Sequence, residues 1–215
     1  MHARHDGRIA WQPLAEKRGA VGIPHRVYTH QVGEDAIMIR LATTDDAAAV
    51  AAIYGPYVAD TVISFEVVPP SVEEMRSRMA AVLERLPWLV FESDGEVVGY
   101  AYASPHRARE AYQWSVDVAV YIQANQHRRG VGRQLYDELF TLLRRLGYVN
   151  AYAGITLPNP KSVGLHEAMG FRPVGVYRNV GFKLGKWCDV GWWHLQLQDL
   201  PAVPAAPLAL PALRR

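Results

Sequence analysis

A single carboxylate interrupts a β-branched strand pattern near the middle of the chain. Residues 115–122 read Ser-Val-Asp-Val-Ala-Val-Tyr-Ile, with a branched apolar residue at every second position. This alternation predicts a strand with one buried face, and it puts Asp117 on the other face. Because aspartate is depleted in strands, Asp117 is either a structural acceptor for nearby N–H groups or a general base that removes a proton from a reacting group.

A basic, glycine-rich loop follows the strand and leads into an apolar stripe at helical spacing. The unpaired N–H groups and the positive dipole end at the start of such a helix attract an anion. Glycines let the backbone approach a ligand closely, and arginines add positive charge. The segment therefore predicts a phosphate-binding loop, with an ordinary tight turn as the alternative. Its candidate residues are Arg128, Arg129, Gly130, Val131, Gly132 and Arg133.

Two familiar nucleotide-binding motifs do not fit this loop. A P-loop requires a lysine and then a serine or threonine after its second glycine, whereas Arg133-Gln134 follows Gly132. A dinucleotide fingerprint requires a third glycine, and position 135 is Leu135. If the loop binds a phosphate, it does so in another kind of fold.

A second motif begins with Asn159-Pro160 and ends with Gly170-Phe171. Its generic content is a short helix with a proline near its start and a glycine at its C-terminus. The helix contains His166, and two interpretations stay open for this side chain. It is either a packed helix histidine or a proton donor, because an imidazole exchanges protons near neutral pH.

The other patterns alternate between strand and helix. The expected strands cover residues 37–41, 88–92, 97–104, 115–122, 148–156, 172–178 and 189–198, with a short extended piece at 62–66. The expected helices cover residues 44–58, 71–86, 131–146 and 160–169. We therefore expect a poorly ordered N-terminal extension at 1–35, one domain at 36–200 and a loose Pro/Ala-rich tail at 201–215. Met38 is a candidate alternative start, and a chain from Met38 to Leu200 is expected to fold.

Composition restricts the class of protein. Half of the 215 residues are hydrophobic and a fifth are charged, which is typical of a globular domain. A formal net charge of +2 without a Lys/Arg run gives no reason to expect a nucleic-acid partner. No apolar stretch approaches the ~20 residues that span a membrane. The only cysteine, Cys188, excludes an intrachain disulfide and fits a cytoplasmic protein, and no histidine spacing predicts a metal site.

Taken together, the two motifs resemble those of the GNAT acetyltransferases. The loop resembles the Gln/Arg-x-x-Gly-x-Gly/Ala segment of that superfamily, with His127 at the leading position. The second motif resembles Asn-x-x-Ser/Ala-x-x-Leu-Tyr-x-x-x-Gly-Phe, with His166 at the tyrosine position. Over residues 37–199 the chain is more narrowly similar to the phosphinothricin and methionine sulfoximine N-acetyltransferases. The runs that carry this similarity are 112–121, 157–159, 165–168, 181–187 and 189–193.

The resemblance implies an α/β (α+β) GNAT fold, a mixed, mostly antiparallel and splayed sheet flanked by helices, in a homodimer. It implies transfer of an acetyl group from acetyl-CoA, without a metal, to the α-amino group of a small, glutamate-like amino acid. A GNAT enzyme acting on a polyamine, an aminoglycoside or a protein N-terminus is one alternative. A non-catalytic acyl-CoA-binding domain is another, and it would need no base at Asp117.

The resemblance also implies roles for individual residues. Asp117 stands where the family has a glutamate as general base, and His166 would protonate the departing CoA thiolate. The backbone of Val120, Tyr121 and Ile122 would pair with the pantetheine arm, residues 128–133 would hold the pyrophosphate, and Asn159 would contact the CoA arm. The substrate-binding candidates are Phe65, Arg107, Arg109 and Tyr112. Core packing is the alternative for Phe65, and a solvated loop is the alternative for the two arginines.

Overall fold

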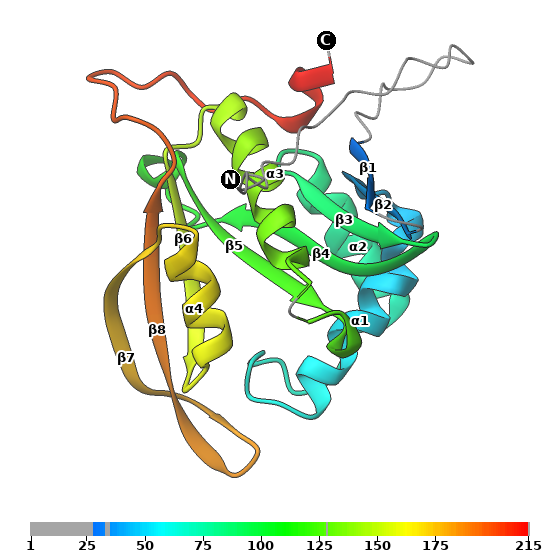
Figure 1. Ribbon diagram of the computed structural model, residues 1–215. Helices are drawn as coiled ribbons and strands as arrows, with labels where there is room; N and C mark the ends of the chain where they lie inside the picture. The colour runs from blue at the N-terminus through cyan, green and yellow to red at the C-terminus, as the bar shows by residue number, and fades with distance from the viewer. Residues whose placement is uncertain (1–27, 33–34, 128, 215) are drawn as a thin grey trace, which may run out of the picture.

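The computed structural model describes residues 28–32, 35–127 and 129–214, which form a sheet covered by helices on both faces (Figure 1). In this part of the chain the sheet has eight strands in the order β1-β2-β3-β4-β5-β6-β8-β7. Neighbouring strands are antiparallel, except that β5 and β6 run parallel. The strands are β1 (Tyr28–Val32), β2 (Asp35–Leu41), β3 (Trp88–Ser93), β4 (Glu96–Pro105), β5 (Ser115–Ile122), β6 (Asn150–Leu157), β7 (Arg172–Lys183) and β8 (Lys186–Gln196).

The helices begin and end at the local signals in the sequence. The hydroxyl of Ser71 accepts the N–H of Glu74 and caps α2. Gly147 ends α3 with a φ of 89°, a left-handed value that favours glycine. The α-helices are α1 (Ala47–Ala59), α2 (Val72–Leu83), α3 (Val131–Leu146) and α4 (Pro160–Ala168). The short 3₁₀ helices are η1 (Thr44–Asp46), η2 (Glu110–Tyr112), η3 (Ala124–Gln126) and η4 (Leu210–Arg214).

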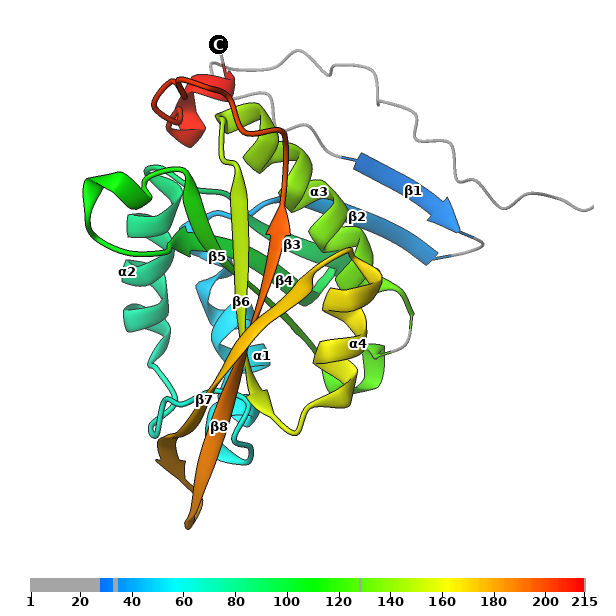
Figure 2. The ribbon, with the colours of Figure 1, turned by 90° about the vertical axis from the view of Figure 1, so that its left-hand side faces the viewer.

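Two apolar cores lie on opposite faces of the sheet. α3 and α4 cover one face, and α1 and α2 cover the other (Figure 2). The expected stripe of α3 is buried against the first face; its residues are Val131, Leu135, Leu139, Leu142 and Leu146. Val50 of α1, Met79 of α2 and Tyr100 of β4 belong to the second core. This arrangement confirms the expected fold class, a mixed and mostly antiparallel sheet between helices.

The structure corrects the boundaries of several expected elements. Residues 62–66 form no strand. β7 extends to Lys183 and joins β8 through a tight turn in which Leu184 and Gly185 have φ values of 49° and 76°. A two-residue hairpin turn of this kind is usually signalled by Asn-Gly or Asp-Gly. Because Leu-Gly is not that signal, the sequence analysis left the middle of this hairpin unassigned.

The N-terminal region also differs from the expectation. Residues 28–32 fall within the segment that we expected to be poorly ordered, but they form β1, an edge strand paired with β2. Met38 lies inside β2, where it is paired with both Thr29 and Glu92. A chain beginning at Met38 would therefore lose the first half of a strand. Residues 1–27 lie outside the described part of the chain.

The C-terminal segment packs against the domain and is not a loose tail. Leu210 is only 1% exposed, and its N–H donates to the carbonyl of Arg85 at 3.0 Å. The N–H of Leu208 donates to the carbonyl of Leu146 at the end of α3, at 2.8 Å. The indole N–H of Trp114 donates to the carbonyl of Ala205 at 2.7 Å. The expectation for 201–215 was wrong because a short apolar segment without periodicity carries no local sign of where it docks.

We expect removal of residues 201–215 to destabilise the fold, because it uncovers the site that Leu210 fills. Leu210→Ala alone should cost about 2–5 kcal/mol, as for other buried leucines. Denaturant unfolding of both variants measures the effect. Leu208→Ala, at a half-exposed position, is the matched control and should cost much less. An unchanged unfolding midpoint after the truncation would contradict the packing described here.

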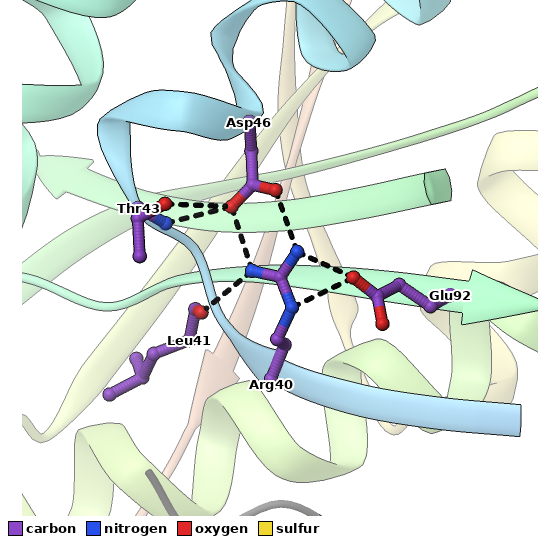
Figure 3. Close-up of polar contacts among 5 residues, drawn as sticks. All are labelled: Arg40, Leu41, Thr43, Asp46 and Glu92. Atoms are coloured by element: carbon purple, nitrogen blue, oxygen red, sulfur yellow. Dashed lines mark hydrogen bonds and ion pairs between the residues drawn. The ribbon is translucent and has the colours of Figure 1, made fainter. Parts of the chain in front are cut away.

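Arg40 of β2 links three elements through one guanidinium (Figure 3). It forms a forked pair with Asp46 of η1, with both nitrogen–oxygen distances at 2.7 Å. On its other side it bonds to Glu92 of β3, through Nε at 2.8 Å and Nη2 at 2.5 Å. Although burial raises the pKa of Asp46, hydrogen bonds from Arg40 and Thr43 outweigh it, so the pKa lies below its ordinary value. The start of α1 is thereby fixed to the sheet.

Replacing Arg40 with methionine should destabilise the domain by roughly 3–5 kcal/mol, because it leaves the carboxylates of Asp46 and Glu92 without their cation. The wild-type advantage should be full above the ordinary Asp value of 3.8 and should shrink as the pH falls through the lower folded pKa of Asp46. Urea unfolding at neutral and acidic pH measures both effects. Arg76→Met, which removes a more exposed arginine, is the control. Equal losses in the two variants would contradict the role of Arg40.

Candidate active site

β5 and β6 pair over only a short part of their length. Ser115–Asp117 matches Asn150–Tyr152, and the pairing stops there, although β5 continues to Ile122 and β6 to Leu157. Beyond that point β6 stays paired with β8, while β5 stays paired with β4. The sheet therefore opens between β5 and β6, which separate toward the bottom of Figure 1.

The opening leaves backbone groups of β5 without a strand partner. In an antiparallel pair, the N–H and C=O of one residue point to the same neighbouring strand, and successive residues alternate. The N–H of Gln123 and the C=O of Ser115 both bond to the β4 side, so the odd-numbered residues of β5 face β4. The even-numbered Val118 and Val120 therefore face the opening, where no described strand pairs with them.

Because of this alternation, the three residues expected to pair with a ligand through their backbone do not all face the opening. The backbone N–H and C=O of Val120 face the opening, as does the N–H of Ile122. The backbone groups of Tyr121 face β4, where Tyr121 is paired with Tyr100. The carbonyl of Ile122 accepts the hydroxyl of Tyr57 at 2.6 Å and is already satisfied. Val118, which the sequence patterns did not single out, joins Val120 as a candidate backbone binding group.

The start of α3 lies just beyond the end of β5. Gly130 precedes the helix with a φ of 78°, and no side chain in the described part of the chain caps the first turn. The N–H groups of this turn therefore have no side-chain acceptor, and the positive end of a 16-residue helix adds to their attraction for an anion. This geometry is compatible with the phosphate-binding loop expected from the sequence, and the binding itself stays a prediction.

The basic side chains of this loop do not all face the helix start. Arg133 donates to the carbonyl of Ala168 at the end of α4, at 3.1 Å. Arg129 is exposed and donates to the side-chain oxygen of Gln126 at 3.2 Å. Arg128 lies outside the described residues. His127 bonds to the hydroxyl of Tyr57 at 3.1 Å, which ties the loop to α1.

Gly132 is needed for close packing. A Cβ at this position would lie 3.1 Å from the side chain of Leu165 and 3.2 Å from that of Ile122. Both distances are shorter than ordinary van der Waals contacts. The glycine therefore lets the first turn of α3 approach α4 and the end of β5.

Asp117 is the last residue of β5 that pairs with β6, so it lies where the two strands part. Its Oδ1 is 2.6 Å from Nδ1 of His106, and its Oδ2 is 4.0 Å from Nη1 of Arg107. Burial raises the pKa of the Asp117 carboxyl above its ordinary value, while the hydrogen bond to His106 and the charge of Arg107 oppose the rise. The sequence patterns pointed to Asp117 and Arg107 but not to His106.

Aromatic rings surround this carboxylate. The ring of His106 stacks on Tyr152 of β6, with 4.4 Å between centroids. Tyr112 and Trp192 of β8 meet the same imidazole edge-on, at 5.9 Å and 6.1 Å. The guanidinium of Arg107 lies over the ring of Trp192, at 5.6 Å. The pair of His106 and Asp117 therefore has apolar walls with one cation beside it.

The substrate candidates from the sequence fall into two groups. Arg107 and Tyr112 lie at the Asp117 cluster, whereas Arg109 is exposed and has no described contact with it. Phe65 lies in the loop after α1, against Gly181 of β7. That loop is held by Lys183, whose buried ammonium donates to the carbonyls of Val58 and Ser64 at 2.6 Å and 2.7 Å.

His166 is not brought together with Asp117. It is 4% exposed, its Nε2 is 2.9 Å from the hydroxyl of Tyr136, and its Nδ1 is 2.8 Å from the carbonyl of Ser162. Burial lowers its pKa, so the neutral ring is favoured. With both ring nitrogens engaged, the arrangement favours a packed histidine over a proton donor.

Asn159 caps α4, because its side-chain oxygen accepts the N–H of Ser162 at 3.1 Å. Its amide nitrogen has no hydrogen-bond partner among the residues that the structure describes. In the same part of the chain, no group of three or more His, Cys, Asp and Glu side chains could hold a metal ion. No helix in residues 35–127 and 129–214 is long and apolar enough to cross a membrane.

Comparison with known proteins gives a consistent result. The family model described as acetyltransferase (GNAT) domain matches residues 39–192. The chain is 40% identical to the phosphinothricin N-acetyltransferase of Streptomyces viridochromogenes over 168 residues, 78% of this chain and 91% of that protein. It is 32% identical to the L-methionine sulfoximine/L-methionine sulfone acetyltransferase of Salmonella typhimurium over 171 residues, 78% of this chain and 98% of that protein. A phosphinothricin acetyltransferase from Sinorhizobium meliloti, solved in complex with acetyl-CoA, superposes with a TM-score of 0.76 at 32% identity, covering 80% of this chain and 95% of that chain.

Proposed function

The chain belongs to the GNAT acetyltransferases, in the family of phosphinothricin and methionine sulfoximine N-acetyltransferases, and we propose that it acetylates the α-amino group of a small, glutamate-like amino acid with acetyl-CoA. One observation carries the proposal. The sheet opens beside Asp117. Unpaired backbone groups of β5 line this opening, and the start of α3, which no described side chain caps, lies just beyond the end of β5. A linear thioester with a pyrophosphate fits this combination of groups.

Acetyl-CoA would lie along the edge of β5. The amides of its pantetheine arm would bond to the backbone of Val118 and Val120, in place of the missing strand partner. Its pyrophosphate would accept N–H groups from the first turn of α3, with charge from Arg128 and Arg129. Asn159 would use its free amide nitrogen on the CoA arm.

The thioester would then lie next to Asp117. The substrate arrives as an ammonium ion, so a proton must leave before its nitrogen can attack. The carboxylate of Asp117 promotes this removal, directly or through an intervening group. The amine attacks the thioester carbonyl, an N–C bond forms, and a strand N–H stabilises the developing oxyanion. The C–S bond breaks, and CoA leaves as a thiolate.

Arg107 is the best-placed side chain for the substrate carboxylate. Its guanidinium lies beside Asp117 and over Trp192, so a bound carboxylate would hold the amino group near the base. Tyr112 and Phe65 would bound the pocket, and Arg109 would add positive charge at its rim. A cationic substrate such as a polyamine would instead meet the charge of Arg107.

The enzyme would work as a homodimer in the cytoplasm. The arm formed by β7 and β8 exposes large apolar side chains from both strands, and an exposed apolar surface of this kind is typical of a protein interface. Their exposure reaches 60% at Phe182 and 64% at Trp187. A second copy of the chain would cover them. The single, unpaired Cys188 and the use of acetyl-CoA support a location in the cytoplasm.

We expect Gly132→Val to weaken acetyl-CoA binding, because the added side chain must displace Leu165 or Ile122 and so move the first turn of α3. Calorimetric titration with acetyl-CoA should show at least a tenfold weaker affinity, which corresponds to about 1.4 kcal/mol. Gly164→Ala is the matched control, since a Cβ there meets nothing within 4 Å. A folded Gly132→Val protein with wild-type affinity would contradict the proposed cofactor site.

We expect Asp117→Asn to lower kcat by about two to four orders of magnitude near neutral pH, the usual contribution of a general base. Acetyl-CoA affinity should barely change, since the cofactor contacts lie on backbone and on α3. The residual rate should rise at high pH, where more of the substrate amine is already neutral. Release of CoA thiol with glutamate, methionine sulfoximine and phosphinothricin as substrates is the assay.

Asp117→Glu is the companion variant, and it should keep substantial activity if the pocket admits one more methylene group. Wild-type kcat in a folded Asp117→Asn enzyme would remove Asp117 from the mechanism. Absence of acetyl transfer to any amino acid by the wild-type enzyme would overturn the proposed substrate class.

A further inference from the structure

We propose that His106 is the group that takes the proton from the substrate ammonium, and that Asp117 acts by holding this imidazole in position. The inference rests on the N-acetyltransferase activity proposed above and names a catalytic residue for it. It begins from the close contact of 2.6 Å between Nδ1 of His106 and Oδ1 of Asp117.

Strand register places the two side chains together. β4 and β5 pair Ser104 with Asp117 and Pro105 with Val116, and His106 is the next residue after β4. Its N–H still donates to the carbonyl of Ser115, at 3.3 Å. The backbone of His106 is therefore fixed against β5 at the level where β5 parts from β6.

Three aromatic rings restrict the orientation of the imidazole. Tyr152 stacks on its face with planes inclined by 20°, while Tyr112 and Trp192 meet it edge-on. Nδ1 is committed to Asp117. Nε2 makes no hydrogen bond to any residue that the structure describes, so it is the ring position left for a substrate proton. The side chain of His106 is 13% exposed, which leaves it reachable but shielded.

The carboxylate itself is less free to act. Oδ1 of Asp117 is taken by His106, and Oδ2 faces the guanidinium of Arg107 at 4.0 Å. A carboxylate that accepts Nδ1–H fixes the tautomer with its lone pair on Nε2, and it stabilises the imidazolium that forms on protonation. An imidazole also exchanges protons near neutral pH, where a general base is most effective. The imidazole also bridges the distance between the short aspartate side chain and the amine.

In the proposed reaction the substrate nitrogen loses two protons. An N–H bond of the ammonium breaks, and its proton goes to Nε2 of His106. The freed nitrogen lone pair forms the N–C bond to the thioester carbon, and the C–S bond breaks with its electron pair on sulfur. The second proton lost from nitrogen passes to that thiolate and gives CoA thiol. The imidazolium returns its proton to solvent.

Three variants of His106 test the inference. His106→Phe keeps a ring against Tyr152 but removes both nitrogens, and His106→Gln keeps a polar group near Asp117. Both should lower kcat by about two to three orders of magnitude, with unchanged acetyl-CoA affinity and unchanged thermal unfolding. The double variant with Asp117→Asn should be little slower than the slower single variant, because the two groups act as one unit. Added imidazole should restore part of the rate in His106→Gly.

The pH profile gives a readout that packing alone would not change. The titratable and charged groups against the ring are Asp117, Arg107, Tyr112 and Tyr152. In the wild type, kcat/KM should fall on the acid side as a proton occupies Nε2. In His106→Phe that acid limb should be lost, and the remaining rate should follow the fraction of neutral amine.

The outcomes separate the inference from the proposed function. His194→Phe is the control. His194 lies against the ring of Tyr152, as His106 does, but its Nε2 bonds to the side chain of Asn150 at 2.9 Å. This variant should keep wild-type kcat. Wild-type kcat in both His106→Phe and His106→Gln, with a slow Asp117→Asn, would overturn the role of His106 and leave the acetyltransferase intact. A wild-type enzyme that acetylates no amino acid would overturn the proposed function and this inference together.

Discussion

Backbone N–H and C=O groups of a central strand need partners, and in β5 those of Val118 and Val120 lose theirs where β6 turns away with β8. Leaving them unpaired would cost free energy if they were buried away from water, so the opening has to be filled by water or by a ligand. A thioester cofactor with amide groups along its arm would supply the missing donors and acceptors. In the proposed site, the same separation of the strands would place the reacting carbon near Asp117, where the opening begins.

The elements around the opening restrict its shape in different ways. The Arg40 network joins β2, η1 and β3 and so positions α1 on the sheet. Tyr57 of α1 then reaches the carbonyl at the end of β5, and Lys183 ties the β7–β8 arm to the loop after α1. These contacts are buried or half-buried, and those of Arg40 and Lys183 are charge-assisted. The opening is therefore surrounded by strands and helices that are held in place by hydrogen bonds.

Polar chemistry at the site is confined to one end of the opening. His106 and Asp117 lie among aromatic rings, so their mutual interaction is screened less than it would be on the surface, while the more exposed Arg107 lies over the ring of Trp192. At the other end, the start of α3 offers N–H groups and a dipole but no carboxylate. A bound molecule with an anionic end and a reactive thioester would therefore have one orientation, set by the charge difference between the two ends of β5.

Local patterns in the sequence determined most of the helices and strands, the left-handed glycine before α3 and the position of Asp117, because periodicity, capping and glycine placement act within a few residues. Tertiary structure decided the rest. The neighbour of Asp117 is set by the register of β4 on β5, and the burial of His166 is set by Tyr136 on another helix. The docking of Leu210 likewise depends on a surface that exists only once α3 is in place. Such contacts join residues far apart in the chain, so their energy has no signature in local composition.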